Sequence, residues 1–257
     1  MKVGIIGYGY VGKAYNKIFK DAVIYDEPLK IGNREEINKC DMALVCVPTP
    51  SLPDGNCDTS IVSSVVEWLE TPLILIKSAI KPGTTDRLKF RFKKRIVVSP
   101  EYVGESKYYI PDRFLNPSDP LKHEFIILGG DDEDCEAVAD IFAPLVGAVT
   151  RIRFMKAIEA EIVKYAENSF FATKVMFANE LREICEAYGA SWHRVREGWI
   201  DDPRVGVMHT AVFPNDRGYD GKCYPKDTIA LMKAAEEKGI KPYILRATIG
   251  GNKKYGK

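Results

Sequence analysis

Residues 218–227, Gly-Tyr-Asp-Gly-Lys-Cys-Tyr-Pro-Lys-Asp, combine residue types that could do covalent chemistry. Cys223 follows a Gly-x-x-Gly loop, and loop glycines let a backbone approach a ligand closely. The ammonium of Lys226 favours a nearby thiolate, which is the reactive form of cysteine. Taken alone, Cys223 has a plain alternative as a buried, inert thiol. A cysteine nucleophile together with a hydride acceptor suggests an oxidation that passes through a thiohemiacetal and a thioester.

The amino-terminal residues carry the signature of a site for such an acceptor. The segment Gly7-Tyr-Gly-Tyr-Val-Gly12 matches G-x-G-x-x-G, after an apolar strand and before a predicted helix at Lys13–Phe19. The first glycine permits a tight turn, the second lets the backbone approach a pyrophosphate, and the third allows the helix to pack on the strand. The helix N-terminus offers N–H groups to the phosphates. We therefore predict cofactor contacts at Gly7, Gly9, Tyr10, Val11 and Gly12.

Asp26 ends the second predicted strand, where an acid hydrogen-bonds the adenosine ribose in such sites. An acid at this position repels a 2′-phosphate, so the sequence predicts NAD rather than NADP. For Asp26 alone, a surface turn residue is the alternative.

Further polar residues lie on a long predicted helix, Met155–Tyr188. Glu161, Lys164 and Asn168 fall at i, i+3 and i+7, on one face. A lysine and an asparagine one turn apart can polarise a sugar oxygen and hold developing alkoxide charge. A solvated stripe is the alternative for this face.

Three more charged residues are candidates. Glu101 and Glu105 lie in Ser99-Pro-Glu-Tyr-Val-Gly-Glu-Ser106, directly after a predicted strand. Arg204 could clamp a carboxylate or a phosphate. A solvated loop arginine is the simpler alternative for Arg204.

The elements that must position these residues indicate two domains. Short apolar runs alternate with helical segments up to residue 152, which predicts a Rossmann-type α/β domain with a doubly wound parallel sheet. Residues 153–257 are predicted to form a mainly α-helical domain, which contains the long central helix and carries the cysteine. Shorter helices are expected near Trp192–Trp199 and Thr228–Lys238, with a frayed tail from Gly250. The predicted strands are Lys2–Ile6, Ala22–Tyr25, Met42–Val47, Leu73–Lys77, Arg95–Ser99 and Phe125–Leu128.

The composition excludes several classes of protein. The formal net charge of +1 over 257 residues argues against nucleic acid or an anionic membrane as the main partner. No apolar run is long enough to span a bilayer, and the first residues predict a strand rather than a signal peptide. The six cysteines are scattered, which favours free thiols in a reducing cytoplasm. The three histidines are isolated, and we expect no metal.

Together these motifs resemble the UDP-glucose/GDP-mannose dehydrogenase family, whose members oxidise the C6 alcohol of a nucleotide sugar to the uronate. The resemblance spans nearly the whole chain. It rests on the glycine loop, Val47-Pro-Thr-Pro50, Lys77-Ser78, SPEYVGES, the E-x-x-K-x-x-x-N helix, Asn179-Glu180, Pro-Arg-Val-Gly and GYDGKCYPKD.

The resemblance implies roles for individual residues. Cys223 is the covalent nucleophile, Lys164 and Asn168 hold the reacting oxygen, Asp227 assists proton handling, and Glu101 is tied to the attack of water on the thioester. The implied cofactor is NAD, contacted by Thr49, Glu105 and Lys226 as well as by the glycine loop and Asp26. The implied substrate is a nucleotide sugar, which the resemblance places against Glu101, Lys164, Asn168, Arg204, Gly218 and Gly221. Arg204 is similar to an arginine that reaches the substrate of a neighbouring subunit, which suits a homodimer built on the long helix.

The chain departs from the family pattern at three points. Ala79 stands where a threonine hydroxyl usually binds catalytic water, and Asp220 stands where a glycine usually precedes Gly221. The family's chains continue into a third domain that grips the nucleotide, so the resemblance implies a short form. Either a separate chain supplies that domain, or the pocket is open and binds a different substrate, or activity is weak or lost.

Two alternatives remain open. A β-hydroxyacid or 6-phosphogluconate dehydrogenase also joins a Rossmann domain to a long helix with lysine and asparagine, but such enzymes use no cysteine. The other alternative is an NAD-binding member of the same family with weak or lost catalysis, which Ala79, Asp220 and the missing domain would support.

Overall fold

The computed structural model describes residues 1–103, 119–120 and 123–257. The chain divides into two compact units. The first comprises Met1–Pro50 and Cys57–Lys164, and the second comprises Ser51–Asn56 and Tyr165–Lys257.

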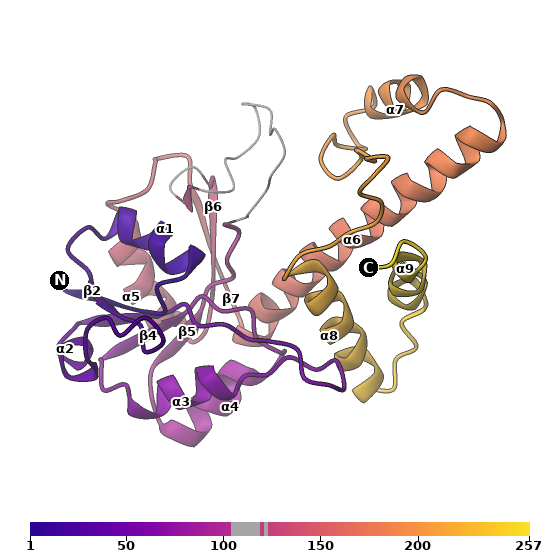
Figure 1. Cartoon of the computed structure of the whole chain (residues 1–257). Coiled ribbons are helices and arrows are strands. Elements are labelled where there is room, and N and C mark those ends of the chain that lie inside the picture. Colours follow the sequence, from indigo (N-terminus) through magenta and orange to yellow (C-terminus); the bar gives the residue numbers. More distant parts are fainter. Residues whose placement is uncertain (104–118, 121–122) are drawn as a thin grey trace. The chain divides into compact units, whose positions relative to one another are not determined.

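The first unit is built on a sheet that, in the described residues, has seven strands in the order β2-β1-β3-β4-β5-β6-β7 (Figure 1). Every neighbouring pair in it is parallel except β5 and β6, which pair in the antiparallel sense with Val98 opposite Gly129. The strands are β1 Val3–Ile6, β2 Val23–Tyr25, β3 Met42–Val45, β4 Leu73–Ile76, β5 Ile96–Val98, β6 Phe125–Gly129 and β7 Arg151–Met155.

Helices cover both faces of this sheet because the strands alternate their side chains between two cores. Leu73 and Leu75 of β4 pack in the core under α1 (Tyr10–Ile18) and α5 (Asp132–Phe142). Ile74 and Ile76 of the same strand pack in the core on the other face, which includes residues of α2 (Arg34–Asn38), α3 (Ser60–Trp68) and α4 (Thr84–Phe92). The predicted doubly wound α/β fold is confirmed.

The edge strand β7 was not predicted from the sequence. Arg151 and Arg153 alternate with half-buried Ile152, so the segment lacks the continuous apolar run of the central strands. The strand continues past residue 152, where the sequence analysis placed the end of the first domain.

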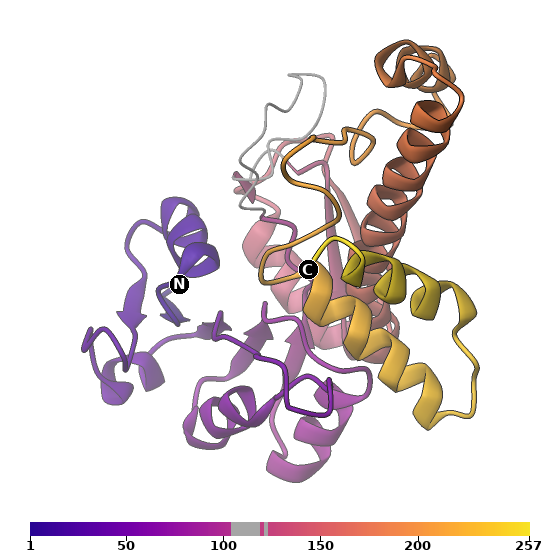
Figure 2. The ribbon, with the colours of Figure 1, turned by 45° about the vertical axis from the view of Figure 1, so that its right-hand side comes forward.

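Helices make up most of the second unit. The long helix α6 (Ala157–Ala187) enters it at Tyr165 and ends before Gly189, whose φ of +67° permits the predicted stop. α7 (Trp192–Ile200), α8 (Tyr224–Glu237) and α9 (Tyr243–Lys253) follow. α8 and α9 lie side by side (Figure 2).

Two predictions in the second unit differ from the structure. We expected a helix near Thr228–Lys238, and α8 covers this segment up to Glu237 but starts four residues earlier, at Tyr224, because Pro225 fits the first turn of a helix. We expected a frayed tail from Gly250, but this residue lies inside α9.

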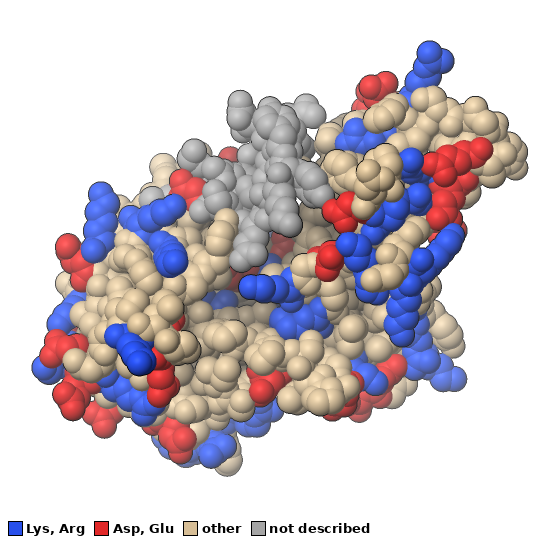
Figure 3. Space-filling view, in the orientation of Figure 1, with Lys and Arg blue, Asp and Glu red and all other residues tan. Residues whose placement is uncertain are grey.

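Acidic and basic side chains are interspersed on the face shown in Figure 3, consistent with the net charge of +1. All six cysteines are free. Among the described residues, no helix is long and apolar enough to cross a membrane.

Candidate active site

The glycine loop after β1 has the backbone geometry of a dinucleotide site. Gly7 has a φ of +90°, and a Cβ there would lie 2.6 Å from the carbonyl oxygen of Cys46. A Cβ at Gly12 would lie 2.0 Å from the carbonyl oxygen of Gly7, so the helix packs closely on the loop. At Gly9 a Cβ would meet no atom of the described residues within 4 Å. A side chain is therefore excluded at Gly7 and Gly12, whereas the space beside Gly9 is free for a ligand.

The N-terminus of α1 is suited to an anion. Gly9 is its N-cap residue, no side chain caps it, and its first turn carries no acidic residue. The helix dipole and the N–H groups of the first turn favour negative charge at this position. The residues present fit a pyrophosphate approaching over Gly9.

Asp26 joins the end of β2 to the glycine loop. Its Oδ2 accepts the backbone N–H of Tyr8 at 2.7 Å, and its Oδ1 accepts that of Leu29 at 2.9 Å. An ionised carboxylate has about four acceptor sites, so both oxygens can still accept ribose hydroxyls.

We predict that the protein binds NAD at least about tenfold more tightly than NADP, equivalent to about 1.4 kcal/mol, because the Asp26 carboxylate would repel a 2′-phosphate. Calorimetric titration with both cofactors measures this ratio. Asp26→Asn should reduce the preference for NAD over NADP. Asp21→Asn, at an exposed residue before β2, should leave this preference unchanged. Equal affinities in the unaltered protein would mean that Asp26 does not face the ribose.

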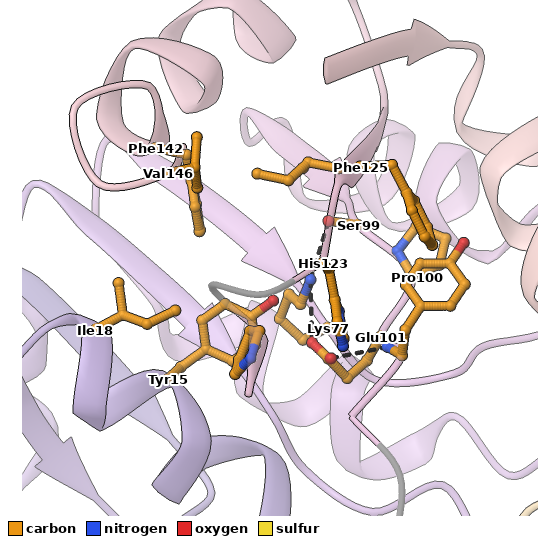
Figure 4. A pocket seen from close by; sticks show the side chains of 13 residues that line it. Tyr15, Ile18, Lys77, Ser99, Pro100, Glu101, His123, Phe125, Phe142 and Val146 are labelled. Carbon is orange, nitrogen blue, oxygen red and sulfur yellow. Dashed lines mark hydrogen bonds and ion pairs between the residues drawn. The ribbon is translucent and has the colours of Figure 1, made fainter. Parts of the chain in front are cut away.

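A buried ion pair lies at the carboxyl ends of β4 and β5 (Figure 4). Lys77 Nζ lies 3.2 Å from Glu101 Oε2 and donates to Ser99 Oγ at 3.0 Å. Glu101 Oε1 accepts the backbone N–H groups of Tyr102 and Val103 at 2.8 and 2.7 Å. Glu101 was predicted from the sequence, but Lys77 was not predicted as its partner. A lysine directly after a fully buried strand was the available signal.

The surroundings of Glu101 have opposing effects on its pKa. Burial raises the pKa, but the Lys77 ammonium and the backbone N–H groups of Val103 and Tyr102 lower it more, so the pKa lies below its ordinary value. Glu101 is therefore ionised at neutral pH.

Thr49 and Ala79 lie on the loops that follow β3 and β4. Thr49 is buried, and its hydroxyl donates to the carbonyl oxygen of Ala79 at 2.7 Å. Ser78 Oγ donates to the carbonyl oxygen of Val47 at 2.7 Å. Thr49 thus ties two loops together, and its oxygen can still accept a hydrogen bond.

Glu161 and Lys164 lie on the part of α6 that belongs to the first unit. Glu161 accepts the backbone N–H groups of Gly83 and Thr85 and the Thr85 hydroxyl, so it caps the N-terminus of α4. Lys164 Nζ lies 4.9 Å from the centre of the Tyr102 ring. Glu161 and Asn168 are 2% and 4% exposed, so the alternative of a solvated stripe is wrong for both.

In the second unit, Cys223 is exposed and is the N-cap residue of α8. One turn along the helix, Asp227 is 1% exposed. Its Oδ2 accepts Asn168 Nδ2 at 2.6 Å, and its Oδ1 pairs with Lys226 Nζ at 2.5 Å. The structure thus brings Asn168, Lys226 and Asp227 together at the start of the helix that begins with the cysteine.

The loop before Cys223 is held by hydrogen bonds from α9, a helix that was not predicted from the sequence. Asn252 Oδ1 accepts the backbone N–H of Tyr219, and its Nδ2 donates to the carbonyl of the same residue, both at 2.9 Å. Gly218 and Gly221 have φ values of +75° and +88°. A Cβ at Gly218 would lie 2.4 Å from Asn252 Oδ1, whereas one at Gly221 would meet nothing within 4 Å.

Asp220, which departs from the family pattern, has a counterion. Lys257 Nζ lies 2.9 Å from Asp220 Oδ2 and 3.0 Å from Asp216 Oδ1. The negative charge that the sequence places beside the cysteine loop is therefore paired.

Arg204 is occupied within the chain. Its side chain is 89% exposed, and its Nε and Nη2 donate to the Asp202 carboxylate. Glu105 lies outside the described residues. Among the described residues, no group of three or more His, Cys, Asp and Glu is placed to hold a metal ion.

These features define a Rossmann-type dinucleotide-binding fold followed by a helical unit with an exposed cysteine at the start of α8. Profiles of the UDP-glucose/GDP-mannose dehydrogenase family match its NAD-binding domain over residues 17–146 and its central domain over residues 158–254. The chain belongs to the UDP-glucose/GDP-mannose dehydrogenase family. The glycine loop precedes the first matched range, so its assignment to NAD rests on the geometry above.

Two curated relatives are UDP-glucose 6-dehydrogenases. AglM of Haloferax volcanii is 33% identical over 240 residues, which covers 85% of this chain and 53% of the relative. The enzyme of Pseudomonas aeruginosa is 31% identical over 234 residues, which covers 85% and 49%. The chain spans about half the length of these relatives.

Solved structures show the same fold. A UDP-glucose dehydrogenase from Pyrobaculum islandicum superposes with a TM-score of 0.80 at 24% identity, over 98% of this chain and 68% of the other. A UDP-D-ManNAc dehydrogenase from Pyrococcus horikoshii gives 0.79 at 22% identity, over 99% and 68%.

Proposed function

We propose that this chain catalyses the NAD-dependent oxidation of a nucleotide-sugar C6 alcohol to the uronate. The observation that carries the proposal is the exposed Cys223 at the N-terminus of α8, one turn from the Asn168–Asp227–Lys226 cluster. The partial positive charge of a helix N-terminus favours a thiolate over a thiol. The two curated relatives named above support the substrate class.

The chemistry would run in four steps. The C6 alcohol loses a hydride and a proton to give the aldehyde, and the Cys223 thiolate adds to the aldehyde carbon. The adduct takes up a proton to become a thiohemiacetal, which then loses a second hydride and its hydroxyl proton and becomes a thioester. Water then cleaves the carbon–sulfur bond, which releases the carboxylate and restores the thiol. NAD, when bound, supplies the acceptor for each hydride.

The described contacts constrain the roles of Asn168 and Asp227. An amide NH₂ has two donors, so Asn168 can donate one to Asp227 and offer the other to an oxygen that develops negative charge. Lys164 would add positive charge to the same oxygen. Because Asp227 is held by two donors, it would accept a proton in a fixed orientation.

The remaining roles follow the family pattern. Glu101 would act on the water that attacks the thioester. The glycine loop, Asp26, Thr49, Glu105 and Lys226 would contact the cofactor, while Gly218, Gly221 and Arg204 would contact the substrate. Lys226 forms an ion pair with Asp227, so a cofactor contact would have to be shared with that carboxylate.

One observation favours a second candidate, an NAD-binding member of the family with weak catalysis. Ala79 offers no hydroxyl, and its carbonyl oxygen already accepts the hydroxyl of Thr49. The segment therefore lacks the side chain that the family uses to bind the catalytic water.

A panel of UDP- and GDP-sugars incubated with NAD distinguishes the two candidates. We expect at least one nucleotide sugar to generate NADH absorbance and a uronate detectable by mass spectrometry. Cofactor binding without NADH formation from any sugar in the panel would favour the second candidate.

We further propose a homodimer built on α6. Phe170, Phe177 and Ile184 are 62%, 54% and 47% exposed and recur every seven residues, which places them on one face of the helix. An exposed apolar stripe of this kind is typical of an interaction surface. In such a dimer, Arg204 of one subunit would reach the substrate bound to the other subunit.

We predict sedimentation of a dimer at micromolar concentration rather than of the 28.9 kDa monomer. The double variant Phe170→Glu/Ile184→Glu should shift the protein to the monomer, because it places charges in the apolar stripe. Phe90→Glu changes an aromatic residue on α4 that is 78% exposed and should leave the dimer intact. A clean monomer for the unaltered protein would contradict the proposal.

A further inference from the structure

Lys77 is a buried lysine that belongs neither to the glycine loop nor to the Asn168–Asp227–Lys226 cluster. It is 4% exposed, and its ammonium has three neighbours in the first unit: Glu101 Oε2 at 3.2 Å, Ser99 Oγ at 3.0 Å and the Tyr15 ring, whose centre lies at 4.8 Å (Figure 4). A buried ammonium requires such compensation, because removing it from water is costly. The lysine is therefore fixed by contacts from β4, β5 and α1.

Glu101 is equally constrained. The backbone of Tyr102 and Val103 holds one of its oxygens, and Lys77 holds the other. Contacts to both oxygens therefore fix the orientation of the carboxylate.

We propose that Lys77 is a positioning residue that keeps Glu101 ionised and in one orientation, so that Glu101 accepts a proton from water and does not serve as an acid. The inference deepens the proposed function, on which the role of Glu101 rests.

The groups that face Glu101 support this assignment. They come from α1, from the loops after β3, β4 and β5, and from the segment that leads into β6. They are Tyr15, Cys46, Lys77, Tyr102 and His123. Burial, followed by the charge of Glu101, raises the pKa of Cys46 to about 12. Burial and Glu101 also raise the pKa of Tyr15, so both groups are neutral at pH 7. Lys77 supplies the cation that forms an ion pair with the carboxylate.

The pH dependence of stability follows from the sign of this effect. The pKa of Glu101 is lower in the folded protein than in the unfolded chain, so its contribution is present above the unfolded pKa and is lost as pH falls through the folded pKa. Without Lys77, burial is opposed only by the remaining hydrogen bonds to Glu101, so its folded pKa should rise. The stability that Glu101 contributes above the unfolded pKa should then be smaller.

The test compares Lys77→Met with the unaltered protein. The carboxyl ¹³C signal of Glu101, assigned with Glu101→Gln, should titrate about one to three pH units higher in Lys77→Met. The rise in Tm from pH 4.5 to 7.5 should be smaller in Lys77→Met than in the unaltered protein. Lys77→Arg should restore a low titration midpoint, because it restores the charge. The same Glu101 midpoint in both proteins would overturn the proposal.

Two controls separate this result from general damage and from failure of the proposed function. Lys94→Met removes another lysine of the first unit, which donates to the carbonyls of Val66 and Glu67, and should leave the Glu101 titration unchanged. The titration needs no turnover, so it decides the role of Lys77 even where no nucleotide sugar is oxidised. Where turnover is seen, Lys77→Met should also move the acid limb of the kcat profile to higher pH. If Lys77→Met does not fold, Lys77→Gln removes the same charge but keeps a polar side chain, and it should also raise the Glu101 midpoint. An unchanged midpoint in Lys77→Gln would equally overturn the proposal.

Discussion

Replacing Cys223 by Ser is expected to reduce uronate formation by about 10⁴-fold or more, because residues that form the covalent intermediate cost on this scale when removed. A serine hydroxyl at the start of α8 is a weak nucleophile without a base to activate it. NAD affinity should change less than about twofold, equivalent to about 0.4 kcal/mol, since the glycine loop and Asp26 are untouched. Rates of NADH formation and calorimetric titration with NAD measure the two effects separately.

Cys40→Ser is the matched control for this substitution. Cys40 Sγ lies 3.5 Å from the carbonyl oxygen of Glu36, and a serine hydroxyl can keep that contact. This variant should retain full turnover. Unchanged uronate formation in Cys223→Ser would remove the covalent route from the account.

The second large effect is expected at the glycine loop, where two substitutions of the same size should act differently. A Cβ at Gly12 would lie 2.0 Å from the Gly7 carbonyl oxygen, which is part of the backbone and cannot turn aside. Gly12→Ala should destabilise the protein by about 3 kcal/mol. This corresponds to a fall in Tm of about 6 to 12 °C and should abolish NAD binding.

Gly9→Ala is the contrasting variant. A Cβ at Gly9 would meet nothing within 4 Å, so the free energy of unfolding should stay within about 0.5 kcal/mol of the parent. The added methyl would occupy the space in which we place the pyrophosphate, and NAD affinity should fall by about tenfold or more, equivalent to about 1.4 kcal/mol. Differential scanning calorimetry with and without NAD measures both quantities. Undiminished NAD affinity in Gly9→Ala would place the cofactor elsewhere.

Much of the fold could be predicted because the central strands are short, continuous apolar runs buried on both faces. β3 and β4 consist of fully apolar residues, all buried, and were predicted with the correct starts. β7 could not be predicted in this way, since an edge strand needs no continuous apolar run and its arginines stay exposed. The antiparallel pairing of β5 and β6 depends on the connection between them rather than on either strand's own sequence.

The candidate site was predictable where chemistry is local in the sequence. Cys223 and Asp227 are one helical turn apart, and the glycine loop is a continuous motif. The Lys77–Glu101 pair, the cap that Glu161 places on α4 and the clamp of Asn252 on Tyr219 each join residues distant in the chain. Such pairs depend on the register of the sheet and the packing of helices, which a single sequence does not display.

The proposed thioester route fixes the ratio of NADH formed to uronate formed. Two hydrides must leave each sugar before the carboxylate is released, so the ratio of NADH formed to uronate formed should be two throughout the progress curve. Absorbance at the NADH band and mass spectrometric counting of the uronate, recorded on the same sample, give this ratio directly. A ratio of one, with free aldehyde or ketone as the product, would contradict the account.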